Sequence, residues 1–332
     1  MKLSLVKRGI ASALCITMIL SGCSAQNETK VNNDESKKVY KIGISQLIEH
    51  PSLDQAREGF IEEMKNLGVE VEVEHTNAQG DPASTQLIAE KFVKDGVDLI
   101  YSIATQSTQS AKKATEENGI PVVFSSVTDP VYAQIVTAKD KIENVTGVSD
   151  KVNAAEILKL AKDLKEDTKV IGVIFNTGES NSEVQVEEVK AAAEKLDMTV
   201  ETVGITTIND IPQAVNTLAE KIDVMYIIGD NLVASAIGLV ANLSIENNII
   251  TLSSIESQAA DGILMGNGLS YYEHGKQAAR MAKKILVDKV DIKDVAIEYP
   301  SSINKIVNVK TMEALGLSKD NKAFEGAEFI GE

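Results

Sequence analysis

The sequence contains few residues that form cross-links, bind metals or act as nucleophiles. Its 332 residues include 2 cysteines, 3 histidines and no tryptophan. It has no G-x-S-x-G, H-E-x-x-H or C-x-x-C motif, and no constellation of metal ligands is evident. These absences exclude a disulfide scaffold and argue against the common hydrolase, zinc and redox sites. A hydrophobic core must therefore stabilise the chain, and its length is sufficient for two domains.

Positive charge is also scarce. The chain has 33 Lys and Arg against 49 Asp and Glu, and three of the basic residues (Lys2, Lys7 and Arg8) lie within the first 22 residues, which contain no acidic residue. From residue 23 onwards the formal charge is therefore 30 − 49 = −19. Such an acidic chain repels phosphate backbones, so no nucleic-acid partner is expected.

The N-terminus has the pattern of an export signal. Basic residues precede an apolar stretch from Ile10 to Leu20, which is too short to span a membrane as a helix. The following "LSGC" resembles the lipobox of bacterial lipoproteins, which implies removal of residues 1–22 and a lipid on Cys23 that anchors the protein to the outer face of the cell membrane. A plain signal peptide is the alternative. The polar stretch that follows predicts a flexible tether over 23–39.

From Tyr40 onwards, short apolar runs alternate with longer amphipathic ones. Ser52 with Gln55 indicates a capping box, and Asp81 before Pro82 indicates a helix cap. After a possible join at 144–153 the pattern restarts, with helices predicted at 153–166, 182–196, 210–221, 231–247 and 271–288, and strands at 169–175, 198–204, 223–228, 249–253 and 262–267. This alternation predicts an α/β fold with two doubly wound parallel sheets.

Polar residues cluster where the predicted strands end, and ligands bind at that edge of open parallel sheets. Helix caps account for part of this polarity. The clusters on both blocks nevertheless suit a small zwitterion, because helix N-termini and hydroxyl groups bind a carboxylate without arginine. The best carboxylate candidates are Thr105, Gln106, Ser107, Ser180, Asn181 and Ser182.

An ammonium group needs a carboxylate partner. Asp230 is the first candidate, with Asp129 and Glu49 behind it, and the alternative for Asp230 is an ordinary cap of helix 231–247. His50 lies at a predicted helix start, as a pocket wall or a structural loop residue. His75 and His274 are predicted at the surface.

Several long motifs occur in the order found in one protein family. They include "SQLIEHPSLDQAREGF", "NAQGDPAS", "IPVVFSSVTDPVYAQIV", "NVTGVSD", "IGVIFNTGESNSEVQ" and "YYEHGKQAARMAKKIL". Over residues 40–317 the chain resembles the solute-binding lipoproteins of ABC importers for tryptophan and tyrosine. The resemblance implies a periplasmic-binding-protein type I-like fold, with a hinge and three crossovers between the lobes. The implied lobes are 40–148 plus 270–300 and 149–269 plus 301–332.

The resemblance also implies function. It predicts a monomer without a cofactor or catalytic activity that holds an aromatic amino acid between closing lobes and delivers it to a membrane permease. The implied pocket, with weaker support for Ser254 and Glu256, includes Gln46, Glu49, His50, Thr105, Gln106, Ser107, Thr128, Asp129, Asn176, Glu179, Ser180, Asn181, Ser182, Asp230, Asn231 and Glu256. Tyr271 is a further pocket candidate, because its ring can stack on an aromatic ligand. Gln46, Glu49 or His50 can serve either tyrosine or tryptophan, so both ligands stay open. The rival hypotheses are a surface adhesin and a hydrolase or isomerase using Asp129, Glu49 or His50.

Overall fold

The structure is a computed structural model that describes residues 38–139, 141–300 and 303–331. The predicted signal peptide (1–22), the lipidation site at Cys23 and nearly all of the predicted tether (23–39) lie outside the described residues. Within the described ranges, no helix is long and apolar enough to cross a membrane. Residues 38–332 form one compact unit.

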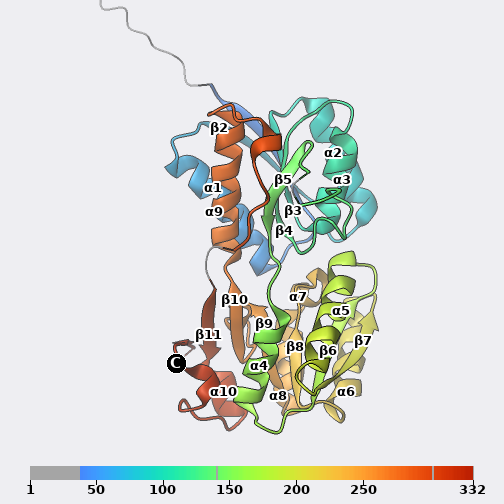
Figure 1. Cartoon of the computed structure of the whole chain (residues 1–332), viewed down its shortest axis with the longest axis vertical. Helices are drawn as coiled ribbons and strands as arrows, with labels where there is room; N and C mark the ends of the chain where they lie inside the picture. The colour runs from blue at the N-terminus through green and yellow to red at the C-terminus, as the bar shows by residue number, and fades with distance from the viewer. Residues whose placement is uncertain (1–37, 140, 301–302, 332) are drawn as a thin grey trace, which may run out of the picture. The chain divides into compact units, whose positions relative to one another are not determined.

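The first half of this unit builds a parallel sheet with the strand order β2-β1-β3-β4-β5 (Figure 1). We call this sheet and its helices lobe 1. Its strands are β1 (Tyr40–Gln46), β2 (Val71–Asn77), β3 (Leu99–Ile103), β4 (Val122–Val127) and β5 (Val145–Ser149). Its helices are α1 (Pro51–Asn66), α2 (Pro82–Asp95), α3 (Thr105–Thr115) and α9 (Tyr271–Leu286), with a short 3-10 helix, η3 (Ile292–Asp294).

The second sheet, with its helices, is lobe 2 and has the order β12-β11-β10-β9-β8-β6-β7. It is parallel except where β10 meets β11. Its strands are β6 (Val170–Asn176), β7 (Thr199–Ile205), β8 (Val224–Ile227), β9 (Ile250–Ile255), β10 (Met265–Leu269), β11 (Asn304–Asn308) and β12 (Glu328–Ile330). Its helices are α4 (Ala154–Leu164), α5 (Ser180–Glu194), α6 (Ile211–Ala219), α7 (Asn231–Ser235), α8 (Ile237–Glu246) and α10 (Val309–Ala314), with 3-10 helices η1 (Ile208–Asp210), η2 (Glu256–Ala259) and η4 (Lys322–Phe324).

Each sheet is covered on both faces, so its strands are buried on both sides. In lobe 1, α1 and α9 cover one face and α2 and α3 the other. In lobe 2, α4 and α5 cover one face and α6 and α8 the other. The predicted α/β class with parallel sheets in two lobes is confirmed.

The chain passes between the lobes after β5, after β10 and again before β11. Helix α9 follows β10 of lobe 2 and returns to lobe 1, where it runs beside α1 (Figure 1). Glycines make this contact unusually close. A Cβ on Gly59 would lie 2.1 Å from the Tyr272 carbonyl oxygen, and one on Gly275 would lie 1.9 Å from the Ala56 carbonyl oxygen. The two helices therefore touch backbone to backbone, which fixes the late helix α9 into lobe 1.

Of the predicted helix starts and ends, some are confirmed and others are wrong. Asp81 caps α2 as expected, because its carboxylate accepts from the amides of Ala83 and Ser84. The capping box at Ser52 is wrong, since α1 begins at Pro51 and the Ser52 hydroxyl instead lies 3.2 Å from the Ser257 hydroxyl. The predicted helix 231–247 is interrupted at Ala236, where φ is −126°.

Candidate functional site

The two lobes meet along the carboxyl ends of their parallel strands. The Gln106 amide, at the start of α3 in lobe 1, donates to the Gly178 carbonyl before α5 in lobe 2 (2.9 Å). Two further contacts join the lobes at this edge, between the hydroxyls of Ser52 and Ser257 and between the Gln185 amide and the Thr128 hydroxyl. These contacts describe a closed arrangement in which α3 and α5 begin opposite each other.

The start of α3 is strained and has unpaired hydroxyl groups. Ala104 has φ 80° and ψ 160°, a backbone region that suits glycine and costs other residues about 1–3 kcal/mol. No side chain among the described residues caps this helix. The hydroxyls of Thr105 and Ser107 each expose less than 1 Å² and have no hydrogen-bond partner in the described part of the chain. The fold therefore holds a helix N-terminus and two buried donors ready for an anion.

The start of the opposite helix also carries buried polar groups without a partner among the described residues. Helix α5 also lacks a side-chain cap within the described ranges. In its first turn the Ser180 hydroxyl and the Asn181 amide oxygen are buried without a partner among the described residues. Two opposed helix N-termini with hydroxyl donors can together bind a carboxylate. Thr105, Ser107 and Ser180 thus offer donors at the two opposed helix starts, whereas the Asn181 oxygen can only accept a hydrogen bond.

Strand β4 adds a second strained residue to the same edge. Its pairing with β5 shifts register between Phe124 and Val127, and Ser126 within this irregularity has φ 60°. The hydroxyls of Ser126 and of Ser45, near the end of β1, are buried without a partner in the described structure. Strain and unpaired polar groups at several strand ends are typical of a binding site.

Asp150 is the functional candidate that the sequence did not single out. It directly follows β5, and its Oδ2 accepts a hydrogen bond from the Tyr271 hydroxyl (2.7 Å). Its Oδ1 is buried and makes no hydrogen bond of good geometry to the described residues, and the Thr128 side chain lies beside the carboxylate. Burial raises the pKa of the Asp150 carboxyl and, reinforced by the neighbouring carboxylate, raises the pKa of Tyr271. A buried carboxylate with an unpaired oxygen can bind an ammonium group, and Tyr271 orients it.

Asp230, the first sequence-based candidate for the ammonium, is occupied within lobe 2. It is 1% exposed, and it accepts from the amides of Asn176 (2.6 Å) and Val233 (2.8 Å) and from the Ser182 hydroxyl (2.7 Å). Burial and the repulsion of Glu179 raise the pKa of Asp230 to about 7. These contacts favour the alternative role as the cap of α7.

Glu179 is likewise occupied, as a hub for amides that border the cleft. Its carboxylate accepts from the side chains of Asn176, Asn181 and Asn231 and from the amides of Asn231 and Leu232. These bonds hold three predicted pocket residues in place, so Glu179 positions the site rather than offering an unpaired oxygen to it.

Other predicted residues are further from this chemistry. Gln46 is buried in a network with Asp54 and Arg57 inside lobe 1. Glu49 is exposed, and Glu256 is half-buried and accepts from the Asn304 side chain. Ser254 is buried beside the Tyr226 hydroxyl.

The crossover after β5 carries an ion bridge between the lobes. Lys151 contacts the carboxylates of Asp129 in lobe 1 (3.2 Å) and Glu188 on α5 in lobe 2. Asp129 also accepts from the amides of Val131 and Tyr132, and these contacts and Lys151 outweigh the effect of burial and lower its pKa. Asp129 therefore stabilises a turn and the closed arrangement.

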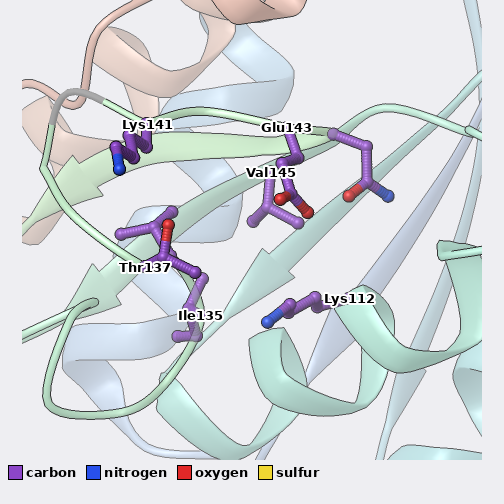
Figure 2. A pocket seen from close by; sticks show the side chains of 8 residues that line it. Lys112, Ile135, Thr137, Lys141, Glu143 and Val145 are labelled. Carbon is purple, nitrogen blue, oxygen red and sulfur yellow. The ribbon is translucent and has the colours of Figure 1, made fainter.

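Cavities lie both at this edge and elsewhere on the molecule. A cavity of about 130 Å³ lies between the lobes and is lined by Leu47, Ile48, Gly80, Pro82, Gln106, Asn176, Gly178, Glu179, Asn231 and Leu232. A larger one of about 550 Å³ lies over α4 and α5, where alanines form much of the wall. The pocket in Figure 2, between Lys112 and the segment around Ile135, has about 10 Å³, which holds no more than one water molecule. Thr105, Ser107 and Ser180, whose hydroxyls are buried without a partner among the described residues, lie next in sequence to the lining residues Gln106 and Glu179 of the cavity between the lobes.

Comparison with known proteins identifies the family. Residues 41–328 match the family described as ABC transporter substrate binding protein. The chain belongs to this family. It is also 39% identical over 319 residues to a "Tyrosine-binding protein" of Clostridioides difficile, covering 93% of this chain and 91% of that protein. No grouping of three His, Cys, Asp or Glu that could hold a metal ion occurs among the residues that the structure describes.

Solved structures similar to this chain include a ligand complex and a ligand-free, open form. The chain is 29% identical to an ABC domain from Streptococcus pneumonia in complex with L-Trp (TM-score 0.83, covering 88% of this chain and 100% of that one). It is 38% identical to a substrate binding protein with adhesive properties from Clostridium difficile, solved in a ligand-free, open form (TM-score 0.68, covering 88% and 99%). The lower score for the protein closer in sequence agrees with the closed arrangement of the lobes here.

Proposed function

We propose that this substrate-binding protein captures a free aromatic amino acid, tyrosine or tryptophan, between its two lobes and delivers it to an ABC permease. One observation supports the proposal most directly. Opposed starts of α3 and α5 present buried hydroxyls that suit an α-carboxylate, and Asp150 presents an unpaired carboxylate oxygen that suits an α-ammonium. The tyrosine-binding relative and the L-Trp complex support an aromatic side chain on the ligand.

The setting of the protein is part of the proposal. The lipobox-like sequence before Cys23 supports export and a lipid anchor, and residues 23–39 would serve as the tether. We propose that the lobes, 40–148 plus 270–300 and 149–269 plus 301–332, close as bodies about the crossovers, with Lys151 bridging them. A monomer without catalytic activity suffices for this role.

A thermal-shift screen of the twenty amino acids on residues 38–332 tests the ligand class. A ligand at a hundred times its Kd stabilises the folded protein by about 2.7 kcal/mol, which raises the Tm of a protein of this size by roughly 5 °C or more. We expect tyrosine, tryptophan or both to give this shift. If neither raises the Tm, the aromatic assignment is wrong.

Surface adhesion is a second candidate function, because one relative is described as having adhesive properties. A lipid anchor and a tether are compatible with that role, and ligand binding can coexist with it. Transport genes beside the gene for this chain favour import, whereas their absence favours adhesion.

A further inference from the structure

His50 has no function in the carboxylate and ammonium sites, yet it is buried between the lobes. It follows β1, precedes the first residue of α1 and is 6% exposed. Its imidazole lies beside the Asn231 side chain of lobe 2, and neither ring nitrogen makes a hydrogen bond of good geometry to the described residues. Such a buried unpaired group is costly unless a ligand satisfies it.

The neighbours of His50 are already committed to other partners. The Asn231 side-chain amide donates to Glu179 (2.6 Å). Asp54, which lies on the first turn of α1, accepts from Gln46 and Arg57. The Asn231 side-chain oxygen lies beside the imidazole and can accept from its N–H, so these neighbours leave the other ring nitrogen without a donor.

Neighbours of His50 line a cavity whose size suits an aromatic ring. Ile48, two residues earlier, and Asn231, next to the imidazole, both line the cavity of about 130 Å³ between the lobes. Leu47, Pro82 and Leu232 supply apolar walls. An apolar cavity of about 150 Å³ accepts benzene, so the volume here is of the right order for a ring. Gln106, Asn176, Glu179 and Asn231 add polar groups to the lining.

We propose that His50 determines side-chain specificity by accepting a hydrogen bond from the ring O–H or N–H of the bound amino acid. This deepens the proposed function, on which it rests, by requiring a ring that carries a polar hydrogen and rejecting phenylalanine. Burial lowers the pKa of His50 to about 4, so the imidazole is neutral near pH 7 and has one nitrogen able to accept. A site built around such a bond discriminates strongly against a ligand that lacks the donor, because a buried polar group is then left unpaired.

Calorimetry with tyrosine, tryptophan and phenylalanine tests this on residues 38–332, His50→Leu and His50→Gln. The unchanged protein should prefer tyrosine or tryptophan over phenylalanine by at least about tenfold. His50→Leu should reduce that preference to about threefold or less, mainly by weakening the polar ligand. His50→Gln keeps an acceptor and should retain part of the preference. His75→Leu is the matched control, because His75 lies on β2, near the charged side chains of Arg57 and Asp54 in lobe 1. This substitution should leave the preference among the three ligands unchanged.

A matched pair of ligands needs no variant. 4-Aminophenylalanine has a ring N–H donor and 4-methylphenylalanine has a similar size without one, so the first should bind at least about tenfold more tightly. Equal binding of this pair, or an unchanged preference in His50→Leu, overturns the role of His50 while tyrosine or tryptophan binding still supports the proposed function. A protein that binds no aromatic amino acid overturns both.

Discussion

Replacing Asp150 by asparagine should weaken amino-acid binding more than any other single carboxylate substitution at the cleft. The Oδ1 of Asp150 is buried and makes no hydrogen bond of good geometry to the described residues, whereas Asp230 and Glu179 already accept several hydrogen bonds. The asparagine side chain has nearly the same shape and can still pair with the Tyr271 hydroxyl. The change therefore removes the negative charge with little disturbance of packing.

The expected loss follows from the burial of the pair. Removing one partner of a buried, hydrogen-bonded charge pair costs about 2–5 kcal/mol. Burial raises the pKa of Asp150, so part of the interaction free energy between the ammonium and the carboxylate offsets the cost of keeping Asp150 ionised. We therefore expect a loss of about 2–3 kcal/mol, or roughly 30- to 150-fold in Kd.

Calorimetry with tyrosine or tryptophan near neutral pH measures this loss and adds a proton signature. An ammonium ligand requires ionised Asp150, so affinity should fall as the pH drops through the raised pKa, beginning above the ordinary value of 3.8. Binding in that range should release protons in the unchanged protein and not in Asp150→Asn. An affinity within threefold of the unchanged protein, with a large loss in Glu49→Gln or Asp230→Asn instead, would refute the assignment.

Two further predictions concern stability. Gly275→Ala places a methyl group against the Ala56 carbonyl and should lower the free energy of unfolding by about 1–3 kcal/mol, which a thermal melt would show as a Tm lowered by several degrees. The control is Gly238→Ala in α8, where the new methyl group meets no atom within 4 Å and should raise the free energy of unfolding by up to about 1 kcal/mol. Burial and Glu179 raise the pKa of Asp230 to about 7, above the 3.8 of an ordinary aspartate, so between these values the folded protein holds a proton on Asp230 that the unfolded chain has lost. Denaturant titrations should therefore show the stability of the unchanged protein relative to Asp230→Asn falling as the pH rises from about 4 through about 7. A stability difference that does not vary with pH would contradict this.

The fold was predictable because its signals are local. Alternating apolar runs and helix starts such as Asp81 identify strands and helices without knowledge of their neighbours. The break at Ala236 was not predictable, because alanine gives no helix-stopping signal there. The burial of His274, predicted at the surface, depends on α9 packing against α1, and no local pattern reports that contact.

The candidate site was predictable in its composition and less so in its roles. Thr105 and Ser180 follow predicted strands, and parallel strands bring such ends together. The difference between Asp230 and Asp150 depends on which oxygens are already hydrogen-bonded, which only the three-dimensional arrangement reveals. Asp150 lies directly after β5, within "NVTGVSD". Because this stretch also has the pattern of a join between the two blocks, the sequence gives no sign that Asp150 belongs to the site.

The return of α9 to lobe 1 has a consequence for how the chain folds. Helix α1 emerges early, but the surface formed by Ala56 and Gly59 is covered only when residues 271–286 are available. Lobe 2 likewise includes β11 and β12, which come last in the chain. Neither lobe can be completed from one continuous segment, and lobe 1 requires contacts between residues more than two hundred positions apart, such as Gly59 and Tyr272. During synthesis from the N-terminus, neither lobe can be complete until almost the whole chain has been made. For the same reason, cutting the chain at one crossover would not yield two independent domains.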